Sequence, residues 1–233
     1  MRVDAHPHLI PDSYRSELER RNLLNFPLPT ADFDALDRMM QRHGIDAAIV
    51  SPSPPDVSFG DGRLAKELAR MLNEESAAMV DEDPERFAAL AILPLPDLDG
   101  ALHELDHALD TLGLDGVMLL SNVDGTYLGD AVWDPLLVEL DRRRAYVLVH
   151  PHRPPYALPL RQHPVWLYEY PFDTTLGRGQ PDLLRSAGAL SRDHVPARSP
   201  SRTSLAVCRS SCGCRELVGH GEFADAGVWG QGG

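Results

Sequence analysis

Cysteine is almost absent from this sequence. Its three cysteines, Cys208, Cys212 and Cys214, all lie near the C-terminus. We therefore expect no disulfide framework in the preceding residues, and a cytoplasmic location is the default prediction. The CxxxCxC spacing does not match a common structural zinc pattern, so these cysteines do not predict a metal site.

Long apolar runs and basic charge are also scarce. No run reaches the roughly 18 apolar residues of a transmembrane helix, and no basic-then-apolar secretory signal opens the chain. The net charge is -13, and Lys66 is the only lysine. A charge of this sign argues against nucleic acid or an anionic membrane as a partner.

Strand-like and helix-like segments alternate in the first 175 residues. In the helix expected over 30–44, Phe33, Leu36 and Met40 recur at helical spacing, Thr30 can cap the start, and Gly44 can end it. The strands are expected over 2–8, 45–51, 87–95, 114–121 and 145–151, and the further helices over 62–84, 97–113 and 130–144. Strands separated by helices indicate βα units and a parallel sheet.

Glycine is missing where an open doubly wound sheet would need it. That fold places a Gly-rich phosphate loop after its first strand, but here the sequence reads HPHLIP. We therefore predict an α/β protein of the (β/α)₈ TIM-barrel type. About five βα units are present, whereas a closed barrel takes about 250 residues, so only the N-terminal portion is expected. Residues 1–175 form this partial barrel, and residues 176–233 are predicted to be an irregular, low-complexity, disordered tail.

Three histidines stand at strand ends. His6 and His8 are two residues apart, so on one strand they project to the same face, with Asp4 one step earlier. His150 closes the apolar segment YVLVH. Each alone is consistent with a solvated strand end. Together they predict one divalent metal site on the rim where barrels carry their active sites.

Weaker candidates lie in the loops and just after the fifth strand. Asn122 and Tyr127, in SNVDGTYLGD, could contact a substrate, although Asn, Asp and Gly also favour turns for local reasons. Phe59 could line the pocket from the loop after the second strand, and His152 could reach a substrate from beyond His150. The remaining histidines of the helical segments are interpreted as surface residues: His43, His103 and His107.

Several of these segments carry a family resemblance. VDAHPHLIP resembles the opening metal motif of the amidohydrolase superfamily. GVMLLSNVDGTYLGDAVWDPLLVELDRR, VLVHP and WLYEYPFDTT resemble its aminocarboxymuconate semialdehyde decarboxylase-like branch, and within that branch the 6-methylsalicylate decarboxylases.

The resemblance implies a barrel with one divalent ion, often zinc with manganese as the alternative, held by His6, His8 and His150. The implied reaction is non-oxidative decarboxylation of an aromatic or unsaturated carboxylic acid, with roles in secondary metabolism and a tendency to homodimers. The family also needs a later histidine and a metal-binding aspartate. His194, His220 and Asp225 lack the matching context, so the catalytic residues stay unassigned.

Two hypotheses concern residues after Thr175. Back-translated and read one base later, GRGQPDLLRSAGALSRDHVPAR permits AAANLICSGALERFPAITFLL, which suits the family and suggests a reading-frame slip. The alternative is a genuine divergent tail. A barrel of five strands would also leave the last strand with an unpaired edge, which predicts poor solubility.

The alternative functions are a metal-dependent hydrolase on the same scaffold, an inactive pseudoenzyme, and a histidine-rich metal-binding module.

Overall fold

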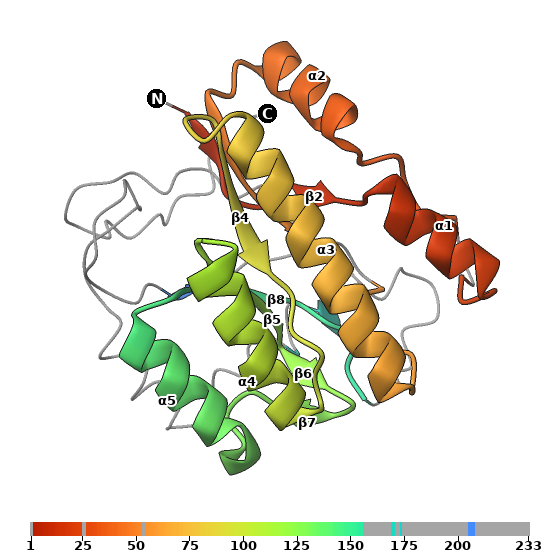
Figure 1. Ribbon diagram of the computed structural model, residues 1–233, viewed down its shortest axis with the longest axis vertical. Coiled ribbons are helices and arrows are strands. Elements are labelled where there is room, and N and C mark those ends of the chain that lie inside the picture. Colours follow the sequence, from red (N-terminus) through yellow and green to blue (C-terminus); the bar gives the residue numbers. More distant parts are fainter. Residues whose placement is uncertain are drawn as a thin grey trace, which may run out of the picture.

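A parallel β-sheet forms the centre of the described part of the protein (Figure 1). The computed structural model describes residues 2–24, 27–52, 55–155, 169–170 and 173, and the backbone of 205–207. The strand order is β1-β3-β4-β5-β8-β9 with every neighbouring pair parallel, and β2 also pairs with β3. The strands are β1 (Val3–Asp4), β2 (His8–Leu9), β3 (Ala47–Pro52), β4 (Phe87–Ala91), β5 (Gly116–Leu120), β8 (Tyr146–His150) and β9 (Leu205–Val207).

Helices connect successive strands, as expected for βα units. They are α1 (Asp12–Arg20), α2 (Phe33–His43), α3 (Gly62–Glu82), α4 (Leu98–Asp106) and α5 (Asp134–Arg143). A π-helical turn, His107–Thr111, extends α4, a 3₁₀ turn, Ala131–Trp133, precedes α5, and β6 (Asn122–Val123) pairs with β7 (Thr126–Tyr127) in a small hairpin. In Figure 1, α3, α4 and α5 lie side by side in front of the strands. The α/β prediction and the partial barrel are confirmed.

The sheet is strongly curled. Four strand spacings separate β2 from β8, which in a flat sheet would place them about 19 Å apart. Instead, the Nε2 atoms of His8 on β2 and His150 on β8 lie 3.1 Å apart. Two imidazole side chains span only part of the flat distance, so the two strands approach each other as opposite walls of a barrel do.

Alternate residues of the central strands belong to two apolar clusters. One contains Val117 and Leu119 of β5 together with buried residues of α2, α4 and α5. The other contains Met118 of β5 and Leu148 of β8 together with buried residues of α1 and α3. His150 follows Leu148 by two residues, so it stands on the second face, which carries the site.

The predicted first strand is divided into two. Asp4 pairs with Ala48 and His8 with Ser51, so the first strand advances four residues where β3 advances three. One extra residue in a strand is a β-bulge, which locally re-aims the side chains. Pro7 lies inside the bulge and has no N–H to donate to the ladder. The bulge separates β1 from β2 and sets the direction of His6.

The helix ends show one correction and one confirmation. Thr30 does not cap α2. Its N-cap is Asp32, whose Oδ1 accepts a hydrogen bond from the Ala35 backbone N–H at 2.7 Å. Gly44 ends the helix in the left-handed conformation, with φ of 62°, as predicted.

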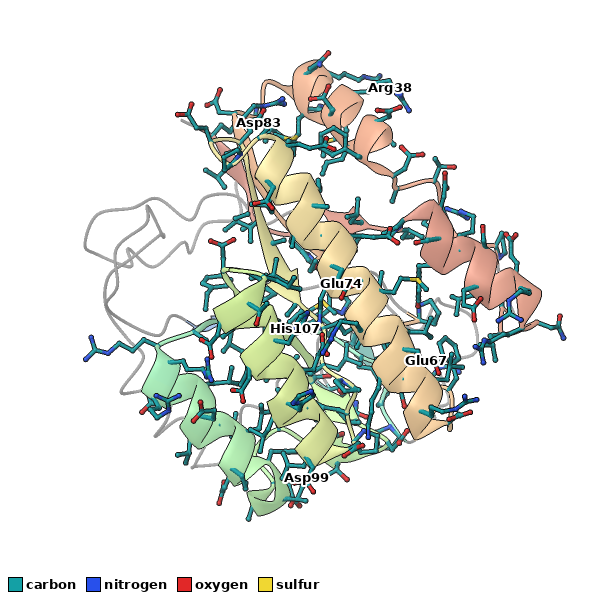
Figure 2. The ribbon with its side chains drawn as sticks, in the orientation of Figure 1. Arg38, Glu67, Glu74, Asp83, Asp99 and His107 are labelled. Carbon is teal, nitrogen blue, oxygen red and sulfur yellow. The ribbon has the colours of Figure 1, made fainter. Side chains whose placement is uncertain are left out.

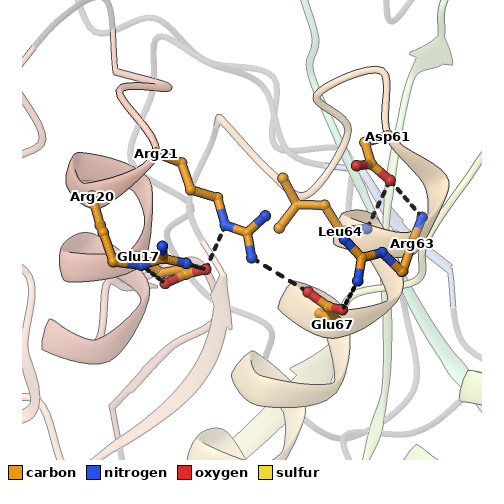
Figure 3. Close-up of polar contacts among 7 residues, drawn as sticks. All are labelled: Glu17, Arg20, Arg21, Asp61, Arg63, Leu64 and Glu67. Carbon is orange, nitrogen blue, oxygen red and sulfur yellow. Dashed lines mark hydrogen bonds and ion pairs between the residues drawn. The ribbon is translucent and has the colours of Figure 1, made fainter.

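The additional helix α1 is held to α3 by charged side chains (Figure 3). Arg21, just beyond α1, donates to Glu17 of α1 at 2.5 Å and reaches Glu67 of α3 at 3.4 Å. At the start of α3, the Asp61 carboxylate accepts from the Arg63 and Leu64 backbone N–H groups. These contacts join α1 to α3 at the surface, and beneath them Tyr14 and Leu18 of α1 pack with residues of α3 in the second apolar cluster.

The predicted boundary at residue 175 lies outside the described residues, as does the tail apart from Leu205–Val207. That segment forms β9, which pairs with Val147–Val149 of β8. The prediction that the fifth strand has an unpaired edge is therefore wrong along these residues. Poor solubility stays a prediction, but this edge no longer supports it.

Charged side chains cover the outer helical surfaces. Figure 2 shows Arg38 on α2 and Glu67 and Glu74 on α3 among them. No helix in the described ranges combines the length and apolarity that crossing a bilayer requires.

Candidate metal centre

The three predicted histidines come together at one end of the sheet. His6 lies in the bulge after β1, His8 lies on β2, and His150 ends β8. His6 and His8 are partly exposed, whereas His150 is buried with 7% of its surface accessible. The Asp4 carboxylate accepts a hydrogen bond from the His6 backbone N–H at 3.1 Å, which stabilises the bulge.

The imidazole rings form a compact triangle. The ring centroids are 4.7 Å apart for His6 and His8, 5.0 Å for His6 and His150, and 4.9 Å for His8 and His150. One ligand nitrogen from each ring can be chosen so that all three lie within 4.8 Å of one another. Three imidazoles from opposite walls of a curled sheet thus converge on one point.

The surroundings favour the neutral form of two of these imidazoles. Burial, followed by the neighbouring His6 ring, lowers the pKa of His8 to about 4. Burial, followed by His8 and then His6, lowers the pKa of His150 to about 3. At neutral pH both rings therefore carry a free lone pair, which is the form that binds a metal ion.

The hydrogen bonds assign a tautomer to His150. Its Nδ1 lies 2.7 Å from the Pro151 carbonyl oxygen, which can only accept, so Nδ1 carries the proton. The lone pair of the neutral ring is then on Nε2, the atom that faces His8. The Nδ1 atom of His8 lies 3.3 Å from the Ser51 hydroxyl, an arrangement that can likewise leave Nε2 free. A ligand histidine whose other nitrogen donates to a backbone carbonyl is a common feature of metal sites.

The donor set fits a divalent transition-metal ion. Two nitrogens bound at about 2.0–2.1 Å to a single ion are about 2.8–3.4 Å apart for bond angles between octahedral and tetrahedral. The Nε2 atoms of His8 and His150 already stand 3.1 Å apart. Three protein ligands also leave coordination positions for a substrate or water, as in catalytic zinc sites.

The predicted loop residues Asn122 and Tyr127 meet an aspartate that the sequence reasoning missed. Asp173 is fully buried and accepts hydrogen bonds from Asn122 Nδ2 at 2.9 Å and from the Tyr127 hydroxyl at 2.7 Å. A third bond comes from the Ser121 hydroxyl at 2.6 Å. These contacts give Asn122 and Tyr127 a role that needs no substrate, and substrate contact stays a prediction for both.

The other candidates separate into near and distant residues. The His152 backbone N–H donates to Ser121 Oγ at 3.0 Å, which places this residue beside the network around Asp173. Phe59 is partly buried and packs against the second apolar cluster. His43 and His103 are exposed, as predicted. His107, also predicted to be a surface residue, is partly buried and lies 3.8 Å from Glu74 of α3 (Figure 2).

Some sequence predictions lie outside the described residues. These are His194, His220 and Asp225, and the cysteines Cys208, Cys212 and Cys214. The only available signal for Asp173 was its place in the segment WLYEYPFDTT, one of those that carried the family resemblance.

Comparison with known proteins gives consistent matches. The family model described as Amidohydrolase matches residues 3–167. The chain is 33% identical over 193 residues to the 6-methylsalicylic acid decarboxylase of Aspergillus aculeatus, covering 80% of this chain and 58% of that protein. It is 32% identical over 155 residues to the 2-amino-3-carboxymuconate-6-semialdehyde decarboxylase of Dictyostelium discoideum, covering 62% of this chain and 41% of that protein.

A solved structure shares the fold. It is a dihydroxybenzoic acid decarboxylase from a Polaromonas species, with bound manganese and the inhibitor 2-nitroresorcinol. The TM-score is 0.60 at 20% identity, and the match covers 88% of this chain and 77% of that one. The chain spans less than two thirds of the length of the Aspergillus relative.

Proposed function

Because this chain belongs to the amidohydrolase family, we propose that it is a metal-dependent, non-oxidative decarboxylase of aromatic carboxylic acids. The observation that carries the proposal is the convergence of His6, His8 and His150 on one point. The decarboxylase relatives support the reaction class, and the name of the Aspergillus relative makes 6-methylsalicylate the first substrate to test.

The described residues prepare the site in three ways. His8 and His150 keep neutral rings at physiological pH, because burial lowers both pKa values. The Pro151 carbonyl directs the Nε2 lone pair of His150 toward His8. His6 adds the third imidazole from the bulge. A divalent ion held there would supply a Lewis acid that polarises substrate oxygens.

The finer parts of the proposal follow from ligand chemistry and from the family. Three imidazoles suit zinc, with manganese as the alternative. We propose Phe59 and His152 as substrate contacts, because Phe59 follows β3 and His152 follows His150 at the same end of the sheet. A homodimer and a cytoplasmic location complete the proposal, the latter because no cysteine precedes Cys208.

The test uses the full 233-residue chain. The protein is stripped with a chelator, reloaded with Zn²⁺ or Mn²⁺, and analysed for bound metal. It is then incubated with 6-methylsalicylate, with a dihydroxybenzoate and with a panel of lactones and amides. Release of CO₂ and addition of water are measured separately. The matched variants are His150→Asn in the triangle and His43→Gln on the exposed surface of α2.

We expect one metal ion per chain, CO₂ release from an aromatic acid, and loss of both in His150→Asn but not in His43→Gln. Hydrolysis of a lactone or amide without CO₂ release would replace the proposal with the hydrolase alternative. Stoichiometric metal without either reaction would overturn the activity and leave a metal-binding module. Absence of metal binding would overturn the metal centre itself.

A further inference from the structure

Ser121 joins the end of β5 to the segment that carries the third histidine. Its backbone N–H donates to the His150 carbonyl oxygen at 2.9 Å, and its Oγ accepts from the His152 backbone N–H at 3.0 Å. Two hydrogen bonds from one residue therefore clamp the backbone on both sides of Pro151. The direction in which His150 leaves β8 depends on this clamp.

The clamp requires the Ser121 hydroxyl to point in one direction. A hydroxyl has a single proton to donate and lone pairs to accept with. Ser121 donates that proton to Asp173 Oδ2 at 2.6 Å, which leaves a lone pair for the His152 N–H. An ionised carboxylate can accept hydrogen bonds but cannot donate them. Asp173 therefore sets the direction of both hydrogen bonds of the Ser121 hydroxyl, the one to its own carboxylate and the one from the backbone after β8.

Asn122 provides a second connection to the same segment. Its Nδ2 donates to Asp173 Oδ2 at 2.9 Å and to the Arg153 carbonyl oxygen at 3.1 Å. Its Oδ1 accepts from the Gly125 backbone N–H at 3.2 Å, so the whole amide is engaged. The segment after β8 is therefore held at residues 152 and 153 by two neighbouring side chains that share one carboxylate, and at residue 150 by the backbone N–H of Ser121.

The burial of Asp173 is unusual for a side chain without a function. Its exposed fraction is 0%, and three side-chain donors surround its carboxylate. A buried carboxylate is tolerated only when such donors compensate its lost hydration. The three donors belong to β6, β7 and the end of β5. Asp173 therefore brings together the loop after β5 and the segment after β8.

We infer that Asp173 is a positioning residue for the metal ligand His150, acting through Ser121 and Asn122. The inference rests on the proposed metal centre and adds to it a residue that does not touch the ion. Ser121 bonds the backbone on both sides of Pro151, and Asp173 stands one hydrogen bond beyond it. Loss of the outer residues that orient a metal ligand commonly lowers metal affinity by about 10–100-fold.

The experiment measures binding of Co²⁺ alone to the full chain, by calorimetric titration and by the visible absorption of the bound ion. Asp173→Asn is compared with Ser121→Ala, with the double variant, and with Asp99→Asn as a control on the exposed surface of α4 (Figure 2). Far-UV circular dichroism and urea unfolding report whether each variant folds. The absorption band reports ligand geometry, which a general loss of stability would not change in the folded fraction.

We expect Asp173→Asn and Ser121→Ala each to weaken Co²⁺ binding about 10–100-fold and to alter the band. The double variant should lose little more, because both changes break one pathway. Asp99→Asn should match the wild type. If Asp173→Asn does not fold, Ser121→Ala, which keeps the buried carboxylate, carries the test. Wild-type affinity and spectrum in folded Asp173→Asn, or in Ser121→Ala, would overturn the inference. Failure of the wild type to bind Co²⁺ would instead overturn the proposed function.

Discussion

The metal affinity of the histidine triangle should fall less at acidic pH than the affinity of a site built from solvated histidines. An imidazole with the reference pKa of about 6.5 is only about 9% neutral at pH 5.5, so two such ligands together would weaken binding about 100-fold relative to neutral pH. His8 and His150 have pKa values lowered to about 4 and about 3, chiefly by burial. Both rings are then largely neutral at pH 5.5. Protonation of these two ligands should therefore weaken metal binding less than about twofold relative to neutral pH.

The assay is the apparent Kd for Co²⁺ at pH 7.5 and 5.5 at constant ionic strength, with circular dichroism to show that the chain stays folded. Protonation of His8 and His150 should account for less than about a twofold part of the measured change. His43→Gln, in which an exposed histidine of α2 is removed, should show the same change as the wild type. A loss of 100-fold or more over this range would refute the reasoning, because it would require His8 and His150 to titrate as solvated imidazoles.

Three further predictions concern stability. Asn73→Ala removes a fully buried amide that pairs with both backbone groups of Ile92, and urea unfolding should show a loss of about 2–4 kcal/mol; a loss below about 1 kcal/mol would contradict this. Gly116→Ala would place Cβ 2.1 Å from a backbone oxygen of β8. The variant should lose about 3 kcal/mol of unfolding free energy or fail to fold. Its control is Gly62→Ala, which has open space around the added Cβ and should unfold like the wild type. Burial, the largest cause, and the Asp124 carboxylate raise the pKa of Asp56 to about 7. The stability that this group contributes is therefore fully present below about pH 3.8, declines as the pH rises, and is lost as the pH passes through about 7. Asp56→Asn should remove that pH dependence in thermal unfolding, and an unchanged profile would show that Asp56 is ionised in the folded chain.

The sheet could be predicted because its strands are buried on both faces. The sequences of such strands are near-continuous apolar runs, as in YVLVH of β8 and GVMLL of β5. His150 was found because it ends such a run. The α1 helix was not expected, since charged residues dominate DSYRSELER and only Tyr14 and Leu18 are buried, and its N-cap Pro11 provides no side-chain cap.

The parts that escaped prediction depend on contacts between distant segments. Asp173 meets Tyr127 across 46 positions of the chain, and no local period marks such a pairing. The bulge that separates β1 from β2 appears only when the first strand is aligned with β3. Asp32 rather than Thr30 caps α2 although both residue types are good caps, because caps are set by the backbone at the helix start.

The curl of the sheet gives the ion a mechanical role. His8 and His150 are separated by 142 positions, so an ion bound to both would cross-link the chain into one long loop. In the chain-entropy model, closing a loop of that size lowers the conformational entropy of the unfolded state, which stabilises the folded state by about 5 kcal/mol. In a protein with no cysteine before Cys208, the metal would therefore serve as a reversible counterpart of a disulfide. Chelation would then act on this chain much as reduction acts on a secreted domain.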